Sequence, residues 1–302
     1  MRDGEGPAAR SLYVIFNPAG RLGRRRWLAR ALAVAGGAGA RATVAETAGP
    51  GHATDLAARL PAGTDMVVVG GGDGLVNEAV NGLLSRDGAT PPVAVLPFGT
   101  ANVLAAELGF APGDRDGAAR AAAAGPTRRI TLGRANGRWF TMMAGVGFDA
   151  EVVAAVRPRL KRVIGKGAFA LAGVATFARW RPRRYVVESD AGCHEAGWIV
   201  VANGRYWAGR YVCAPGADLA APSLQLVLFG CRDRLALLRA LLAVAAGRVA
   251  RHADARLLTV TRARIAAADG AAEAVQIDGD IAATLPLTIE AVADALTVVR
   301  PV

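Results

Sequence analysis

The chain has 302 residues, 53% of them hydrophobic, and a formal net charge of +11. This length suits two domains of ordinary size, each with its own core. The charge fits an anionic partner, such as nucleic acid, a membrane surface or a phosphorylated ligand, and equally a solvated arginine-rich surface, because lysine occurs only at Lys161 and Lys166. The three cysteines are odd in number and widely spaced, which argues against a disulfide framework and against a zinc site.

No segment has the ~18 uninterrupted apolar residues that a membrane span needs, because Arg239 interrupts the nearest candidate, "LALLRALLAVAAG". The first residues, "MRDGEGPAAR", carry charges with no apolar segment behind them. We therefore expect a cytoplasmic protein that meets the inner membrane surface only peripherally.

Between residues 11 and 110, short apolar runs alternate with helix-like stretches. We predict strands over "SLYVIFNP", "RATVAET", "DMVVVGGGDG" and "PVAVLPFGT". Helices are predicted over "RRRWLARALAVAGG", "HATDLAARL", "LVNEAVNGLL" and "ANVLAAELG". Strands and helices in strict succession indicate an α/β domain with a parallel sheet covered on both faces.

The pattern changes near Ile130, where short alternating runs such as "RYVVES", "GWIVVANG" and "LQLVLFG" begin. Their spacing predicts an antiparallel sandwich or curled sheet, interrupted by helices at about 150–180 and 232–250. We predict a flexible N-terminus over 1–10, an α/β domain over 11–129 and a β-rich domain over 130–302, whose last few residues can return to the first domain.

The turn after the third predicted strand is unusually rich in glycine. Gly71, Gly72 and Gly74 permit positive φ angles and let backbone N–H groups approach an anion, and the following helix adds its positive end. An ordinary strand-to-helix turn could also use these glycines, and the pattern matches neither Gly-x-Gly-x-x-Gly nor the Walker sequence. Asp73 would repel phosphates, so its presence suggests a bridging Mg²⁺ or a role in proton transfer.

Two further acidic positions stand beside glycines. In "VQIDGDIAATLPL", Asp278 and Asp280 flank Gly279, which fits either a pair of reacting carboxylates or a common turn. In "GVGFDAEV", Asp149 fits either a site residue or the N-cap of the next helix.

Five ordered motifs carry a resemblance to a known family: "NPAG", "GGGDGLVNEAVNGL", "PFGTANVLAAELG", "GVGFDAEV" and "QIDGD". Together they resemble the diacylglycerol kinase catalytic-domain family, which includes bacterial lipid kinases and sphingosine kinases and is distantly similar to NAD kinases. The resemblance covers about residues 11 to 301. It implies an N-terminal nucleotide-binding domain, a C-terminal β-rich domain for the lipid substrate, and an ATP site in the cleft between them.

The resemblance also implies roles for individual residues. Asp280 is expected to accept the proton of the lipid hydroxyl, with Asp278 sharing or orienting this role, while Glu78 and Asn81 match helix residues facing the cleft. His52 matches a position that lies near the nucleotide in relatives or simply caps a helix. Asn203, Tyr206 and Trp207 match a cleft-lining segment, or else an ordinary hairpin with aromatic packing. The implied contacts with ATP and its Mg²⁺ are Asn17, Thr47, Gly71, Gly72, Asp73, Gly74, Asn77 and Thr100.

Two departures from the family pattern matter. Leu75 stands where the family usually has threonine, so a hydroxyl for a phosphate oxygen is lost, at a cost of about 1 kcal/mol. Ala221-Pro222 replace an Asp-Gly pair that helps to hold a structural Mg²⁺ in many bacterial relatives. We therefore expect no such structural metal, and we do not transfer that role to Asp218.

A basic and apolar segment over 157–184 contains nine basic residues and no acidic ones, with apolar residues between them. Such a segment can lie on an anionic membrane, although a helix packed on its own core with extended arginine side chains has the same composition.

The sequence thus favours an ATP-dependent kinase acting on a membrane lipid. A nucleotide or lipid sensor of the same fold and an NAD kinase-like enzyme remain as alternatives. Nucleic acid is not an expected partner, since no stacking platform or recognition helix accompanies the charge. The oligomeric state stays open, a homodimer included.

Overall fold

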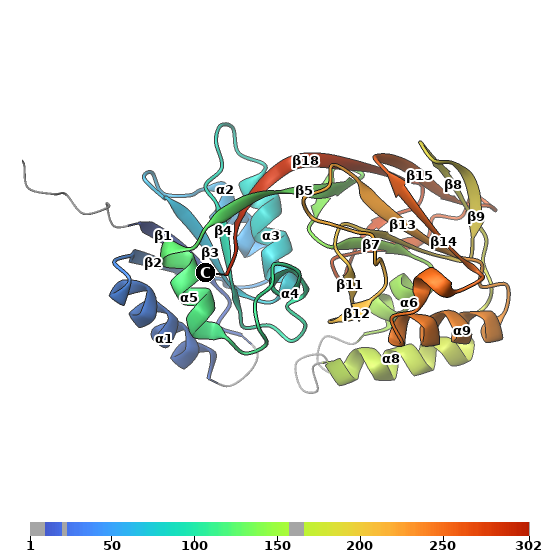
Figure 1. Ribbon diagram of the computed structural model, residues 1–302, viewed down its shortest axis with the longest axis horizontal. Coiled ribbons are helices and arrows are strands. Elements are labelled where there is room, and N and C mark those ends of the chain that lie inside the picture. Colours follow the sequence, from blue (N-terminus) through green and yellow to red (C-terminus); the bar gives the residue numbers. More distant parts are fainter. Residues whose placement is uncertain (1–9, 20–22, 157–165, 302) are drawn as a thin grey trace, which may run out of the picture. The chain divides into compact units, whose positions relative to one another are not determined.

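The computed structural model describes residues 10–19, 23–156 and 166–301, which divide into two compact units (Figure 1). The N-terminal unit contains the described residues up to Gly99, then Leu108–Arg128 and the residues from Leu296 onward. The C-terminal unit contains Thr100–Glu107 and Arg129–Ala295.

The N-terminal unit is built on a parallel sheet in the strand order β2-β1-β3-β4, which the end of β18 extends through a pair between Val298 and Val93. The apolar β-branched runs form its buried strands, as the sequence predicts. Helices α1 and α5 pack together, as do α2 and α3. The strands are β1 (Ser11–Phe16), β2 (Arg41–Glu46), β3 (Met66–Gly71) and β4 (Val93–Pro97). The helices are α1 (Arg24–Gly37), α2 (His52–Ala58), α3 (Asp73–Leu83) and α5 (Arg115–Ala124).

Glycine and aspartate set the helix ends and contacts in this unit. Asp114 caps α5 by accepting a hydrogen bond from the N–H of Gly117 at 2.7 Å. At Gly82 a side chain would place its Cβ only 2.1 Å from the carbonyl oxygen of Thr54, so glycine allows α3 to pack closely against α2.

The C-terminal unit is an antiparallel β sandwich. One sheet has six strands in the order β14-β13-β10-β7-β16-β17, and β18, β15, β8 and β9 pair in that order in the other. The larger strands are β7 (Met143–Val146), β8 (Tyr185–Ser189), β9 (Gly192–Ala196), β10 (Trp198–Ala202), β13 (Leu224–Phe229), β14 (Ala255–Val260), β15 (Arg262–Ala267), β16 (Ala274–Ile277), β17 (Asp280–Thr284) and β18 (Leu287–Val299).

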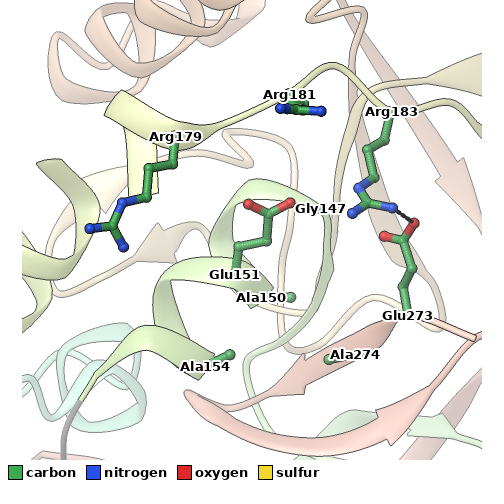
Figure 2. Close-up of a pocket in the computed structure, with 9 residues that line it drawn as sticks. All are labelled: Gly147, Ala150, Glu151, Ala154, Arg179, Arg181, Arg183, Glu273 and Ala274. Atoms are coloured by element: carbon green, nitrogen blue, oxygen red, sulfur yellow. Dashed lines mark hydrogen bonds and ion pairs between the residues drawn. The ribbon is translucent and has the colours of Figure 1, made fainter. Parts of the chain in front are cut away.

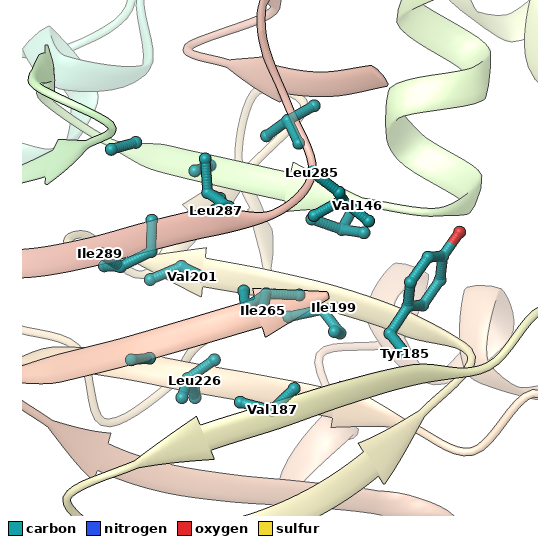
Figure 3. Close-up of a cluster of buried hydrophobic side chains, with 14 of the residues drawn as sticks. Val146, Tyr185, Val187, Ile199, Val201, Leu226, Ile265, Leu285, Leu287 and Ile289 are labelled. Atoms are coloured by element: carbon teal, nitrogen blue, oxygen red, sulfur yellow. The ribbon is translucent and has the colours of Figure 1, made fainter. Parts of the chain in front are cut away.

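The core of the sandwich lies between these two sheets (Figure 3). Val146, Ile199 and Leu226 come from the six-stranded sheet and meet Val187 and Ile265 from the other sheet, all of them buried. Apolar residues therefore alternate inward along each strand, which is the period that the sequence shows.

Helices and short hairpins complete this unit. The helices are α4 (Val103–Glu107), α6 (Phe148–Ala155), α8 (Lys166–Arg179), α9 (Arg234–Ala245) and the 3₁₀ helix η1 (Val249–Arg251). Strands β5 (Thr127–Ala135) and β6 (Arg138–Phe140) form one hairpin, and β11 (Tyr206–Trp207) and β12 (Tyr211–Val212) form another. The predicted helix over 150–180 is two helices, α6 and α8, and residues 157–165 lie outside the described residues.

The first domain was predicted to run without interruption to residue 129, but Thr100–Glu107 belongs to the C-terminal unit. Glu107 explains this difference. Only 4% of its side chain is exposed. The carboxylate accepts hydrogen bonds from the N–H groups of Arg205 and Tyr206 and forms an ion pair with the Arg205 guanidinium. A buried acid with three donors holds the segment to the C-terminal unit.

Candidate functional site

The loops that follow four parallel strands lie at one edge of the N-terminal sheet. Phe16 pairs with Gly70 and Gly71 pairs with Pro97, so β1, β3 and β4 end at the same level. The N–H of Thr47 donates to the Phe16 carbonyl at 2.8 Å, which brings the end of β2 to this edge as well. Six of the residues with implied nucleotide contacts therefore lie at or just after strand ends at one edge: Asn17, Thr47, Gly71, Gly72, Asp73 and Gly74.

The glycines of the β3–α3 turn are needed for close packing. A side chain at Gly71 would place its Cβ 2.4 Å from Cδ2 of Leu75, and one at Gly72 would lie 3.2 Å from Cα of Gly99. The positive φ that glycine permits is not used here, because Gly71, Gly72 and Gly74 are not among the positive-φ glycines, and Gly72 has φ −107°. Gly71 and Gly72 therefore lie where neighbouring atoms leave little room for a side chain.

Helix α3 begins at Asp73, inside the glycine turn. The first N–H groups of the helix therefore lie within the turn itself, with Gly72 at the N-cap and no side chain capping it. Leu75 is 8% exposed and packs against Gly71, so the alkyl group that replaces the family's threonine fills space beneath the turn.

The next positions on α3 hold the helix and its neighbour. Asn77 is 3% exposed, and its side-chain and main-chain oxygens accept from Nδ2 of Asn81 at 3.2 and 2.9 Å. Glu78 Oε2 accepts from the N–H of Ala53 at 3.3 Å, at the start of α2. Nδ1 of His52 accepts from the N–H of Ala48 at 2.9 Å, a local contact of the capping kind.

Asn17 shapes the loop after β1. Its Oδ1 accepts from the N–H of Ala19 at 2.8 Å, and its carbonyl accepts from Nη1 of Arg24 at 3.3 Å. Arg24 also donates to the carbonyl of Ala19. Sequence reasoning missed this arginine, which brings a positive charge to the loop.

Thr100 follows Gly99 directly but is exposed and belongs to the C-terminal unit. It is thus the one implied nucleotide contact that lies outside the N-terminal unit.

The Asp278-Gly279-Asp280 motif forms a tight hairpin between β16 and β17. Ile277 pairs with Asp280, and both turn residues are left-handed, with φ of 47° at Asp278 and 88° at Gly279, as in a type I′ turn. Asp280 is the first residue of β17 and is exposed to solvent. The motif is therefore a common turn in geometry, and its two carboxylates occupy different environments.

The carboxylate of Asp278 accepts four hydrogen bonds. One oxygen accepts from the N–H and hydroxyl of Thr141 at 2.7 and 2.9 Å, and the other from the N–H groups of Met142 and Met143 at 2.9 and 3.0 Å. These donors occupy lone pairs of both carboxylate oxygens. Asp278 thus fixes the hairpin against the segment that leads into β7.

Two hydrogen bonds through the buried side chain of Gln276 connect Asp149 to the same hairpin. Asp149 Oδ2 accepts from Nε2 of Gln276 at 3.0 Å, and Oε1 of Gln276 accepts from the N–H of Gly279 at 2.9 Å. Burial raises the pKa of Asp149 to about 6, against the lowering effect of its hydrogen bond from Gln276. The N-cap of α6 is Gly147, so the capping alternative for Asp149 was wrong.

Gln276 was missed by sequence reasoning, although it stands in the quoted "QIDGD" motif two residues before Asp278. A polar residue between Val275 and Ile277 in an apolar strand was the available signal, since buried polar groups need partners.

The segment with Asn203 has a structural role. Asn203 is fully buried, and its Nδ2 donates to the carbonyls of Thr131 and Thr141 at 2.7 and 2.8 Å. Tyr206 and Trp207 form the β11–β12 hairpin, and the Trp207 ring lies 5.8 Å from the Trp198 ring. These contacts match the aromatic hairpin that the sequence offered as one of its two interpretations.

At the Ala221-Pro222 departure, the carbonyl of Ala221 accepts from the hydroxyl of Thr131 at 2.6 Å. Asp218 Oδ1 accepts from the N–H of Ala220 at 3.0 Å. Across the described ranges, no group of three or more His, Cys, Asp or Glu residues is arranged to hold a metal ion. Likewise, none of the helices in the described part of the chain is long and apolar enough to cross a membrane.

The chain matches two family models in succession. Residues 11–135 match the diacylglycerol kinase catalytic domain, and residues 142–300 match the YegS C-terminal NAD kinase β-sandwich-like domain. A diacylglycerol kinase of Mycobacterium tuberculosis is 32% identical over 82% of this chain and 80% of its own length. A diacylglycerol kinase of Bacillus subtilis is 34% identical over 59% of each chain.

Solved structures agree on the fold. A Bacillus anthracis protein described as a candidate diacylglycerol kinase superposes with a TM-score of 0.83 at 20% identity, covering 99% of this chain and 98% of its own. A second structure, of a diacylglycerol kinase from the same organism, gives a TM-score of 0.77 at 21% identity over 96% of both chains. The two family models together span nearly all of the described residues, and the chain belongs to the diacylglycerol kinase catalytic-domain family, with a YegS-type C-terminal domain.

Proposed function

We propose that this protein is an ATP-dependent lipid kinase that transfers the γ-phosphoryl group of ATP to a hydroxyl of a diacylglycerol-like or sphingosine-like lipid. The observation that carries the proposal is the β3–α3 turn, where packing keeps the backbone bare and α3 begins inside the turn at Asp73. Such a helix start binds phosphate through N–H groups and its positive end.

In this reaction the lipid hydroxyl oxygen attacks the γ-phosphorus, the bond to the β-phosphate oxygen breaks, and ADP leaves. Asp280 accepts the hydroxyl proton, because it is the exposed member of the hairpin and Asp278 is fully engaged with Thr141, Met142 and Met143. Mg²⁺ bound with ATP would neutralise charge on the phosphates, and Asp73 is the carboxylate in the turn that fits such a cation.

The test is phosphorylation of lipids by the purified protein with Mg²⁺ and labelled ATP, with products identified by mass spectrometry. Diacylglycerol, sphingoid bases and phosphatidylglycerol are offered separately as acceptors. Asp280→Asn and Asp73→Asn should each lower turnover at least a hundredfold while the protein stays folded. Absence of any phosphorylated lipid, with ATP bound but never consumed, would contradict the proposal.

One observation favours a second candidate, a nucleotide or lipid sensor without turnover: Leu75 takes the place of a phosphate-binding hydroxyl. Saturable ATP binding with no consumption of ATP would identify this case. Phosphorylation of NAD in the absence of lipid would instead identify an NAD kinase-like enzyme.

We further propose that α8 and α9 carry the contact with an anionic membrane. Large apolar side chains on both helices are exposed: Leu171 (57%), Val174 (70%), Leu235 (53%), Leu238 (40%) and Leu242 (60%). Nε of Arg234, at the start of α9, donates to the carbonyl of Trp180, just after α8, at 3.0 Å.

Arginines accompany this apolar surface. Arg179 ends α8 and Arg239 lies on α9, and neither helix contains an acidic residue. Exposed aliphatic side chains beside cations fit a surface that places its apolar groups at the acyl boundary and its charges at anionic head groups. The other part of the predicted basic segment, 157–165, lies outside the described residues.

A further inference from the structure

A cavity of about 300 Å³ lies within the C-terminal unit, between α6, the segment that follows α8 and the start of β16 (Figure 2). Three arginines at alternate positions, Arg179, Arg181 and Arg183, line it opposite Glu151 and Glu273. A cavity of this volume is at the small end of the range for small-molecule sites.

The arginine segment is held in place at both of its ends. Trp180 is 2% exposed, and its carbonyl accepts from Arg234 at 3.0 Å. Tyr185 is fully buried at the start of β8, and its hydroxyl donates to Glu273 Oε2 at 2.6 Å. The guanidinium groups therefore project from a fixed backbone, which lowers the entropy lost when they bind a ligand.

The charges in the cavity do not balance. Arg183 pairs with Glu273 at 2.7 Å, and the Tyr185 hydroxyl supplies a second donor to the same carboxylate. Within the described residues, Arg179 and Arg181 have no hydrogen bond or ion pair, and Glu151 is the only remaining acid among the lining residues. The lining residues therefore carry a net charge of +1. The guanidinium groups of Arg179 and Arg181 both have N–H donors available for a ligand.

A neighbouring cavity of about 490 Å³ shares Arg181, Arg183 and Glu273. Arg181 therefore lies where the two spaces meet, and a ligand held by its guanidinium group can extend into either of them.

We propose that Arg179 and Arg181 bind a phosphate anion in this cavity, with the rest of the ligand extending into the neighbouring cavity. Guanidinium groups match phosphate oxygens in geometry and charge, and a phosphate monoester or diester supplies the negative charge that the cavity lacks. The phosphate can come from a phospholipid head group or from free phosphate. This site goes beyond the proposed phosphoryl transfer, because it needs neither ATP nor the glycine turn.

Calorimetric titration of the full chain without ATP tests the proposal and keeps it separate from kinase activity. The ligands are short-chain phosphatidylglycerol below its micelle concentration, inorganic phosphate, and short-chain diacylglycerol, which has the same tails without phosphate. Either phosphate ligand is expected to bind through the two arginines, whereas any binding of diacylglycerol, the proposed acceptor, should not depend on them. Binding of the phospholipid alone identifies a lipid head group as the source, and comparable binding of inorganic phosphate identifies the free anion.

Three variants sharpen the result. Arg179→Gln together with Arg181→Gln should weaken phosphate binding at least tenfold, whereas Glu151→Gln, which removes the opposing charge, should strengthen it severalfold. Arg264→Gln is the matched control, because it removes an exposed arginine of β15 that lines neither cavity. No phosphate-dependent binding, or equal binding by wild type and the double variant, would overturn the proposal.

Discussion

The side-chain amide of Gln276 joins the carboxylate of Asp149 to the backbone of Gly279, with bonds of 3.0 and 2.9 Å. The amide can serve both partners only in one orientation, with nitrogen toward Asp149 and oxygen toward Gly279. An ionised Asp149 accepts a hydrogen bond and so selects this orientation. The geometry of the Asp278-Gly279-Asp280 hairpin is therefore coupled to the charge of a residue in α6.

Asp149→Asn should disturb this coupling, because the asparagine NH₂ group would face the NH₂ group of Gln276. If the amide of Gln276 turns over to relieve this contact, the N–H of Gly279 loses its acceptor. We expect kcat for lipid phosphorylation to fall about tenfold, with little change in the KM for ATP. Gln276→Glu keeps an acceptor for Gly279 but loses the donor to Asp149, and it should also lower kcat. Wild-type kcat in both variants would show that the hydrogen bonds through Gln276 do not position the hairpin.

The stability of the protein should depend on pH through Asp149. Burial raises its pKa from 3.8 to about 6, so the folded state holds a proton that the unfolded chain releases in this window. The stabilising contribution is fully present below about pH 4 and is lost as pH rises through about 6, a difference of about 3 kcal/mol. The measurement is the free energy of unfolding of wild type and Asp149→Asn between pH 4 and 7. Their difference should change with pH, and parallel curves would contradict the prediction.

Substitution of Asp278 should lower stability, whereas substitution of Asp280 should remove activity with little change in stability. Asp278→Ala leaves the donors of Thr141, Met142 and Met143 without their acceptor, so we expect a loss of about 2–4 kcal/mol in the free energy of unfolding. Asp280→Asn changes an exposed side chain and should alter stability by less than about 0.5 kcal/mol while removing turnover. Chemical denaturation and lipid kinase assays on both variants check this. The reverse pattern would make Asp278 the proton acceptor.

Leu75→Thr should lower the stability of the fold and raise its affinity for ATP. Leu75 is 8% exposed and packs against Gly71, so its replacement should destabilise the fold by about 1–3 kcal/mol. A hydroxyl at the helix start should strengthen ATP binding up to about tenfold. Titration with ATP and denaturation curves measure both effects. Leu75→Val, which shortens the side chain without a hydroxyl, is the control and should lose stability without gaining affinity.

The α8–α9 surface should control vesicle binding. Val174→Asp together with Leu242→Asp places two acids on the apolar surface, and we expect at least a tenfold loss of binding to vesicles rich in phosphatidylglycerol. Tyr211→Asp, at a side chain that is 50% exposed on β12, is the control. Flotation with anionic and zwitterionic vesicles measures the effect. Equal binding by all three proteins would assign membrane contact elsewhere.

Much of the fold could be predicted because its signals are local. The run before Gly71 is apolar and β-branched, and the helix over 24–37 has the bounds that its sequence predicts. The end of the first domain could not be predicted, because it depends on Glu107 meeting Arg205, a contact between residues far apart in the chain. The burial of the Leu75 side chain could not be predicted either, because it depends on how the folded turn packs.

The candidate site could be predicted only in part. Its glycines and aspartates are visible as residue types, and the parallel sheet predicts that strand ends share an edge. The different environments of Asp278 and Asp280 could not be seen, since both are carboxylates in one turn and only the folded chain shows which donors surround Asp278. The arginines that line the cavity beside α6 are visible in the sequence, but the ion pair of Arg183 with Glu273 is not.

The path of β18 has a consequence for biosynthesis. Val298 pairs with Val93, and the N–H of Arg300 donates to the carbonyl of Pro126, so the N-terminal unit includes residues that are translated after the whole sandwich. Until those residues leave the ribosome, β4 lacks a neighbour on one side, and the first unit to be synthesised is the last to be completed.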